Sequence, residues 1–461
     1  MLECLRMNMM EITHDMRENK QINVKNQILI VVALSVPAIL EQLVNTAMSY
    51  IDTAMVGSLG YQATAAIGVV ASTTWLFGGL ATSCTMGFYV QVAQYLGANR
   101  KKDARDVVCQ GFVFSILFGL ILAGIVVGIS KYLPSWLGAE ISIQSDATKY
   151  LAIVGAFIPF NMLVMLCSGF LRCSGNALLP SVLNIMMCVF DVLFNALFIY
   201  ILRLGVAGAA LGTGMAQVVV AIILFVLVIK KDGPLKLEGD ENWKFAKQIL
   251  LNAFHLATPA ALERITLSLA QVVMTGIVSG MGAISVAVNY VTVSAEGICY
   301  LPAYGIAGAA TTLVGQSIGA KRKDMAKRFA YLTTLLGFIL VLVLSILMYV
   351  FAPVLISTLT NDMQVIQKGS TCLRIVSFSE PLYAISIIVI GALRGAGDSK
   401  RPFVLNALSM WGVRVLTIAL FTKQYGIIGV WATMTFELVF RGIIFLIRLL
   451  RGKWVDQNSL R

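Results

Sequence analysis

Charged and metal-binding side chains are scarce in this sequence. Only 13% of the 461 residues are Asp, Glu, Lys or Arg, 58% are hydrophobic, and there are two histidines. The eight cysteines stand singly, with neither the Cys-x2-Cys spacing of a zinc site nor the pattern of a disulfide framework. The sequence also lacks a nucleophile–base set, a cofactor motif and a nucleotide-binding domain. We therefore expect no enzymatic activity, no cofactor and no direct use of ATP.

What the sequence has instead is a series of long apolar runs. Mean hydropathy is +0.84, and apolar runs of roughly 18 or more residues recur along the chain, which is typical of a helical protein that crosses the membrane many times. We predict an all-α integral membrane protein with 12 transmembrane helices. Their expected ranges are 28–56, 66–94, 107–129, 147–172, 178–200, 207–229, 248–279, 283–316, 328–350, 368–394, 402–421 and 427–449.

The basic residues are distributed unequally between the two sides of these helices. Lys and Arg number 26 in the terminal segments and every second loop, but five in the opposite loops. Because positive charge is kept on the cytoplasmic side, both termini are predicted to be cytoplasmic, in the inner membrane of a prokaryote. The net charge of +12 then reflects topology and contact with membrane lipids, and we expect no binding of nucleic acid.

The chain repeats itself with an offset of 222 residues. Pro37 and Glu41 recur as Pro259 and Glu263, and the loop QYLGANRKKDA at 94–104 recurs as QSIGAKRKDMA at 316–326. Each repeat holds an even number of helices, so we predict two six-helix bundles related by a pseudo-two-fold axis along the membrane normal. The expected parts are a cytoplasmic tail (1–27), a first lobe (28–229), a cytoplasmic inter-lobe loop (230–247), a second lobe (248–450) and a cytoplasmic tail (451–461).

Three motifs carry a resemblance to a known family. They are Pro-x3-Glu followed by DTAMVGSLG in the first helix, the paired Gln-x2-Gly-Ala-x-Arg loops, and LRGAGDSKRP at 393–402. In this order they resemble the multidrug and toxic compound extrusion (MATE) transporters. The resemblance implies a secondary antiporter that expels organic cations and amphipathic drugs in exchange for Na+ or H+ by rocker-switch alternating access. We expect a monomer. Two alternatives stay open: an exporter of an endogenous metabolite, and a flippase for a lipid-linked sugar.

Carboxylates inside the apolar runs are the first candidates for function, because a charge at the centre of a bilayer costs about 2.5–3.5 kcal/mol on insertion scales. Glu41 has a counterpart in Glu263, so both are expected to serve a structural role common to the lobes. Asp52 and Asp191 have no carboxylate at the equivalent positions of the second lobe. This asymmetry indicates a function that belongs to the first lobe.

We predict a cation site in the first lobe from Asp52, Asp191, Asn195 and Thr213, which share a depth in the outer half of the membrane. Asn184 is added because it falls on the same helix face as Asp191 and Asn195. Such a set offers oxygen ligands to Na+, whereas two carboxylates close together at low dielectric can instead share a proton. The resemblance supports the same four residues. MATE proteins usually have Asn-x3-Asp where this chain has Asp191-x3-Asn195, so the choice of ion stays open.

Two further sets of candidates follow from residue chemistry. Flexible and aromatic side chains repack around varied ligands, and the candidate substrate-cavity residues are Asn45, Met48, Tyr50 and Met215. The charged candidates of the second lobe are Glu263, Glu296, Glu380 and Arg414. Because buried opposite charges usually pair, we expect a structural ion-pair network there, with a second, coupled proton site as the alternative. The residues expected in this network are Glu296, Arg374, Arg414, Glu437 and Arg441.

Overall fold

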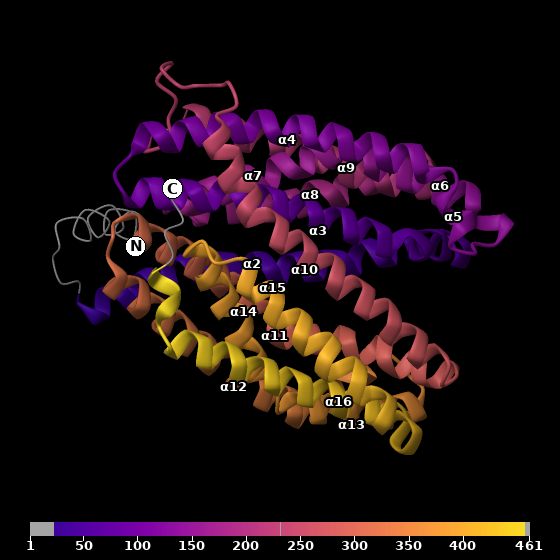
Figure 1. Ribbon diagram of the computed structural model, residues 1–461. Helices are drawn as coiled ribbons and strands as arrows, with labels where there is room; N and C mark the ends of the chain where they lie inside the picture. The colour runs from indigo at the N-terminus through magenta and orange to yellow at the C-terminus, as the bar shows by residue number, and fades with distance from the viewer. Residues whose placement is uncertain (1–22, 231, 457–461) are drawn as a thin grey trace. The chain divides into compact units, whose positions relative to one another are not determined.

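The computed structural model describes residues 23–230 and 232–456, and every regular element in this part of the chain is a helix (Figure 1). Much of the two predicted tails, residues 1–22 and 457–461, lies outside the described residues. The first half of the chain forms α2 (Val24–Gly57), α3 (Tyr61–Gly97), α4 (Lys101–Ser130), α5 (Leu133–Trp136), α6 (Ile141–Ala156), α7 (Ile158–Cys173), α8 (Leu178–Asn195), the π-helix η1 (Ala196–Ile201) and α9 (Gly205–Lys230). The second half forms α10 (Lys247–Ser279), α11 (Ala283–Gly319), α12 (Lys323–Ser357), α13 (Met363–Ser377), α14 (Glu380–Gly395), α15 (Lys400–Ala407), the π-helix η2 (Leu408–Val415), α16 (Leu416–Leu450) and the 3-10 turn η3 (Lys453–Asp456).

Most of these helices can cross a membrane. Nine helices among the described residues are long and apolar enough, and two bent pairs, α6 with α7 and α13 with α14, raise the number to 11. The remaining predicted span corresponds to α15, η2 and the first part of α16. It ends where Gly426 takes a non-helical conformation (φ 54°, ψ −134°). The all-helical membrane fold predicted from the sequence is therefore confirmed.

Two helices that the sequence predicted as continuous, 147–172 and 368–394, are each broken. α6 and α7 meet at 43°, and α13 and α14 meet at 56°. Pro159 and Pro381 stand in the first turn of the second helix of each pair. A proline can begin a helix there, but its missing N–H and its ring prevent the preceding helix from continuing through it. The two bends correct the sequence prediction, and the repeat shares both prolines.

The 222-residue repeat is also visible in the backbone. Positive φ angles occur at Gly60 and Gly282, before α3 and α11, at 105° and 93°. They occur again at Asn99 and Lys321, after the same helices, at 60° and 58°. Positive φ is uncommon for residues that carry a Cβ. Its recurrence at matched positions shows that the two halves share their turns as well as their helices.

The helices form two compact units whose limits differ from those of the predicted lobes. Of the described residues, those from Leu40 to Ala261 form the first unit, and the remainder form the second. The limits therefore fall inside α2 and α10, and each of these helices contributes residues to both units. The predicted boundary in the loop at 230–247 follows the chain connectivity, whereas the structural boundary follows packing.

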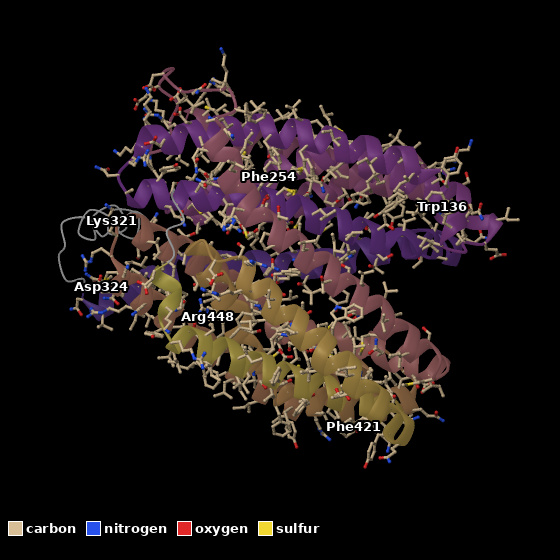
Figure 2. All side chains as sticks on the ribbon, in the orientation of Figure 1. Trp136, Phe254, Lys321, Asp324, Phe421 and Arg448 are labelled. Atoms are coloured by element: carbon tan, nitrogen blue, oxygen red, sulfur yellow. The ribbon has the colours of Figure 1, made fainter. Side chains whose placement is uncertain are left out.

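Each unit has its own apolar core. In the first unit Phe112 and Phe170 lie in a core formed mainly by α3, α4, α7 and α9. In the second unit Ile388 and Trp431 lie in a core formed mainly by α11, α12, α14 and α16. Other large apolar side chains point outward, such as Trp136 at 70% exposure (Figure 2). Exposed apolar surface on long helices is the face expected to contact lipid.

Close packing of α14 on α11 should make Gly391 intolerant of a side chain. A Cβ at this position would lie 2.5 Å from the carbonyl oxygen of Ala307. We expect Gly391→Ala to destabilise the protein by about 1–3 kcal/mol and to lower the thermal unfolding midpoint in detergent. Gly124→Ala in α4 is the matched control, because a Cβ there meets nothing within 4 Å and alanine favours a helix by up to about 1 kcal/mol. Equal midpoints for the two variants would contradict this packing.

Candidate cation site

Four of the five predicted cation-site residues come together in the first unit. Asp52 lies on α2, Asp191 and Asn195 on α8, and Thr213 on α9. Asp191 and Asn195 are one helical turn apart and share a face of α8. Asn195 is the last residue of α8 and is followed by the π-helical turn η1. Such a local widening of a helix is frequent at functional sites.

The amide of Asn195 connects the two carboxyl groups. Its Nδ2 donates to Oδ1 of Asp52 at 3.1 Å and to Oδ1 of Asp191 at 3.0 Å. The Thr213 hydroxyl donates to the same Asp191 oxygen at 2.9 Å. The Asp52 and Asp191 carboxyl groups also lie within hydrogen-bonding reach of each other. The four side chains therefore form one connected polar group.

This carboxyl pair differs in its charge balance from three other buried carboxylates. Glu41, Glu263 and Glu437 each form an ion pair with an arginine. Within the described residues neither Asp52 nor Asp191 has such an ion pair, and Asp191 is 6% exposed. Two ionised carboxylates at a site of low dielectric repel each other and lose hydration. Relief of this repulsion therefore requires a proton or a bound cation at the site.

The amide oxygen of Asn195 is the unused atom of the group. It is buried and accepts no hydrogen bond within the described part of the chain. It faces α9 at Gly212, where a Cβ would lie 2.0 Å from it. Because Gly212 has no side chain, Asn195 can turn its Nδ2 toward both carboxyl groups. The free acceptor beside them is suited to a water or a cation.

Asn184 does not belong to this group, which corrects the sequence prediction. Its Nδ2 donates to Oε1 of Glu41 at 2.9 Å. Asn184 does lie on the same helix as Asp191, but seven residues earlier, which is about 10 Å along the axis. Two side chains so far apart cannot hold one ion. The shared face of α8 therefore predicted correctly that Asn184 and Asp191 point to the same side, but it did not predict which residue Asn184 contacts.

The ion-pair network predicted in the second unit is present in part. Arg374, which was expected in it, is exposed and donates to the Tyr349 carbonyl at 3.4 Å. Arg414 and Arg441 both pair with Glu437 at 2.6 Å. The Ser409 hydroxyl, on the π-helical turn η2, donates to the same carboxylate at 2.5 Å. All four side chains are buried. Ser409 is the member that the sequence did not indicate, because only the widened turn brings it into reach.

The remaining second-lobe candidates separate into two groups. Glu263 accepts from Arg394 at 3.0 Å and from Asn406 at 2.8 Å. Glu296 and Glu380 are 3% and 0% exposed, and neither forms an ion pair within the described residues. Both carboxyl oxygens of Glu380 are buried, and its carboxyl group lies within hydrogen-bonding reach of that of Glu296. These two glutamates are therefore outside the ion-pair network.

The candidate substrate residues lie on α2 and α9. Asn45 accepts from the Cys188 thiol at 3.4 Å, Met48 is buried, and Tyr50 is 43% exposed. A cavity of about 150 Å³ within the first unit is lined instead by residues of α3, α4, α6, α7 and α9, and none of the four candidates lines it. Its polar lining residues, which the sequence analysis did not select, are Thr74, Asn161 and Gln217. Each of them is an isolated polar residue within an apolar run of the sequence, and this pattern could have marked them as candidates.

Comparison with known proteins identifies the family. The family model MatE matches residues 37–201 and 259–420, together more than half of the chain. The chain belongs to the MatE family. The two matched ranges begin at Pro37 and Pro259, the same pair of prolines that marks the internal repeat.

Relatives and solved structures of similar fold cover most of this MatE-family chain. The probable multidrug resistance protein NorM of Thermotoga maritima is 25% identical over 438 residues, 93% of each chain. The uncharacterized transporter YisQ of Bacillus subtilis is 25% identical over 92% of this chain and 95% of its own.

Two solved structures share the fold at 20% identity. A MOP superfamily transporter from Pyrococcus furiosus matches with a TM-score of 0.88, over 94% of this chain and 97% of its own. A mutant of the Vibrio cholerae MATE transporter VcmN matches with a TM-score of 0.88, over 95% and 99%. The predicted architecture of MATE transporters is therefore confirmed. Membership of the MatE family shows that the protein is a membrane transporter and not an enzyme.

A side chain at position 212 should break the bridge that the Asn195 amide forms between Asp52 and Asp191. Gly212→Ala would force Asn195 away from α9, because the new Cβ would also lie 2.8 Å from the Asn195 backbone nitrogen. We expect the rate of transport per folded molecule in vesicles to fall at least about tenfold, the equivalent of one or two hydrogen bonds to charged groups. Gly124→Ala serves again as the control and should transport normally. A normal rate for folded Gly212→Ala would show that the Asn195 bridge is not needed.

The two kinds of buried glutamate in the second unit should respond differently to neutralisation. Glu437→Gln leaves Arg414 and Arg441 buried without a counter-charge and should destabilise the protein by about 3–5 kcal/mol. Glu380→Gln removes a carboxyl group without a basic partner and should cost less than about 1 kcal/mol. Thermal unfolding of the two purified variants measures the difference. Similar losses in both would mean that Glu380 is as firmly paired as Glu437.

Proposed function

We propose that this protein is a secondary antiporter that exports organic cations and other amphipathic drugs in exchange for a coupling cation. The coupling cation binds at Asp52, Asp191, Asn195 and Thr213 in the first unit. The observation that supports this proposal is a pair of carboxyl groups inside apolar helices, bridged by one amide and without a basic partner among the described residues. The name of the NorM relative, a probable multidrug resistance protein, supports the class of substrate.

The arrangement of donors favours H+ over Na+ as the coupling ion. Asn195 and Thr213 direct N–H and O–H donors at Oδ1 of the two carboxyl groups. Those donors occupy Oδ1 of both carboxyl groups, so a metal ion, which needs several oxygen ligands at once, would be left with the two Oδ2 atoms and the amide oxygen of Asn195. A proton needs only one carboxyl oxygen as its site and a second as its acceptor, and two adjacent carboxyl groups provide both. Na+ is the alternative ion.

The proposed cycle uses rocker-switch alternating access of the two units in the inner membrane, with both termini in the cytoplasm. Entry of the cation removes one of the two negative charges of the Asp52–Asp191 pair and releases the drug outward. Loss of the cation restores negative charge, which favours rebinding of a cationic drug. The exchange is electrostatic in origin, because one charge in a site of low dielectric excludes a second of the same sign.

Two other substrate classes are less well supported. A flippase for a lipid-linked sugar would need basic side chains free to bind a polyanionic head group. Arg414 and Arg441 are both paired with Glu437, which reduces the positive charge available. An exporter of an endogenous metabolite would use the same cation site and differ only in the transported substrate. Competition between a metabolite and a drug for transport therefore distinguishes the two functions.

The test uses purified protein in liposomes loaded with ethidium, with a pH gradient and a Na+ gradient imposed separately. We expect efflux driven by the pH gradient in wild type, and a loss of at least about a hundredfold in Asp52→Asn and in Asp191→Asn. The reason is that asparagine cannot take up a proton in this range, and removal of a positioned proton site typically costs 10²–10⁴-fold. Thermal unfolding checks that both variants remain folded.

Other outcomes change the proposal in defined ways. Efflux driven by Na+ alone and lost in Asp191→Asn would replace H+ by Na+ at the same residues. Wild-type efflux in folded Asp52→Asn would overturn the site. No ethidium efflux under either gradient would reject drug export and favour a metabolite or a lipid-linked sugar.

A further inference from the structure

One arginine of the second unit is exposed at membrane depth. Arg374 lies on α13 one turn before its bend with α14, near the middle of the broken span that these two helices form. It contacts Tyr349, which stands about 12 Å along the axis from the end of α12. The hydrocarbon layer of a bilayer is about 30 Å thick, so both residues lie well inside it. A charge at this depth is costly, and its presence indicates a function.

The surface around Arg374 is apolar and aromatic. Tyr349 and Phe378 are 42% and 71% exposed, and their rings meet edge to face with centroids 5.5 Å apart. On α12, Val350 and Val354 are each 58% exposed. Exposed apolar side chains on membrane-spanning helices are expected to contact lipid. Arg374 therefore lies beside a surface that faces lipid.

Arg374 differs from the buried arginines of the same unit because it has no counter-charge. Arg414 and Arg441 pair with Glu437, whereas no ion pair involves Arg374 within the described residues. Its Nε donates to the Tyr349 carbonyl at 3.4 Å, and its guanidinium carbon lies 5.8 Å from the centroid of the Tyr349 ring. These contacts orient the guanidinium group without neutralising it. Both Nη atoms stay available to two oxygens of one anion.

The geometry of α13 directs these donors toward the nearer membrane surface. Each Cα–Cβ bond of a helix tilts toward the N-terminus, and α13 begins directly after the turn that follows α12. A long basic side chain can extend in that direction until its charge reaches the head groups. Gln367 is exposed two turns nearer the turn, on the same face as Arg374. Its amide side chain adds a second hydrogen-bond donor above the arginine.

A second copy of this chain does not supply the missing negative charge. Among the described residues, the carboxylates at membrane depth are buried in their units or belong to the cation site. A symmetric contact through this face would also bring two arginines together, and like charges repel. The first unit has no such surface, since Ala152 and Val127 stand where the second unit has Arg374 and Tyr349. The shared fold therefore does not require this arginine.

We propose that Arg374 binds the phosphate of an anionic phospholipid in the leaflet on the side of the α12–α13 turn. The two Nη atoms donate to two phosphate oxygens, Gln367 donates to the head group, and the acyl chains lie against Phe378 and Val350. The phosphate neutralises the guanidinium group where it lies. A zwitterionic lipid binds more weakly, because its ammonium group offsets the charge of its phosphate. The surface lies wholly in the second unit and does not depend on the proposed transport cycle.

The test is titration of the purified full-length protein in detergent with phosphatidylglycerol, with bound lipid measured by native mass spectrometry. In Arg374→Gln the Kd of the tightest-bound lipid should rise about tenfold, the equivalent of one hydrogen bond to a charged group. Arg374→Lys keeps the charge but loses the fork of two donors, so its Kd should fall between the two. Lys131→Gln removes a charge just after α4, the counterpart of α12, and is the control. It should bind as wild type does.

A second variant distinguishes a lipid site from a charge that is merely unfavourable. Arg374→Leu removes the cost of a charge in hydrocarbon together with the phosphate contact. Relative to wild type, its thermal unfolding midpoint should fall in nanodiscs of phosphatidylglycerol, because a ligand of the folded state is lost. In nanodiscs of phosphatidylcholine the midpoint should not fall. A midpoint that rises equally in both lipids would show that no phosphate neutralises Arg374, and would overturn the proposal.

Three further results would also overturn the proposal. The first is equal affinity of wild type and folded Arg374→Gln for phosphatidylglycerol. The second is stabilisation by inorganic phosphate equal to that by the lipid, which would assign the arginine to a free anion. The third is a wild-type dimer, seen by light scattering, that dissociates in Arg374→Gln, since a second copy would then cover this face. We expect inorganic phosphate to leave the unfolding midpoint unchanged, and both proteins to be monomers.

Discussion

A carboxylate inside an apolar helix must be neutralised where it lies, and this constraint shapes most of the polar structure of the protein. Hydration is lost on burial, and only a nearby cation, a proton or several donors can replace it. Glu41, Glu263 and Glu437 meet the requirement with arginines. Asp52 and Asp191 meet it with an amide, a hydroxyl and each other. An arginine partner keeps a buried carboxylate charged and in a fixed position. A carboxyl pair that has no such partner can take up and release a cation.

The internal duplication separates these two roles. A residue that both halves keep serves the shared fold, as Glu41 and Glu263 show, because each accepts from an arginine and an asparagine at matched positions. A residue present in one half alone does not belong to the shared fold. Asp52 and Asp191 are of this kind, and both lie in the polar group around Asn195. The asymmetry therefore has a physical basis: the second unit resembles the first in packing but not in charge.

Several features of the fold followed from the sequence, and others did not. The apolar runs predicted the all-helical membrane fold, because this depends on local composition. The bends at Pro159 and Pro381 were missed, although the prolines were visible, because a proline within a span is compatible with a kink or with a new helix. The π-helical turns η1 and η2 were missed because they depend on how α8 and α15 pack. The unit boundary inside α2 and α10 was missed for the same reason.

By itself the sequence determined that this is a duplicated helical membrane protein and which carboxylates are unmatched, since periodicity, composition and offset are properties of the chain alone. Only the tertiary structure decided which side chains meet. It joined Asp52, Asp191, Asn195 and Thr213, and it placed Asn184 beside Glu41. Residues seven apart on one helix face point in the same direction yet contact different neighbours, because a helix rises about 1.5 Å per residue and a hydrogen bond spans about 3 Å.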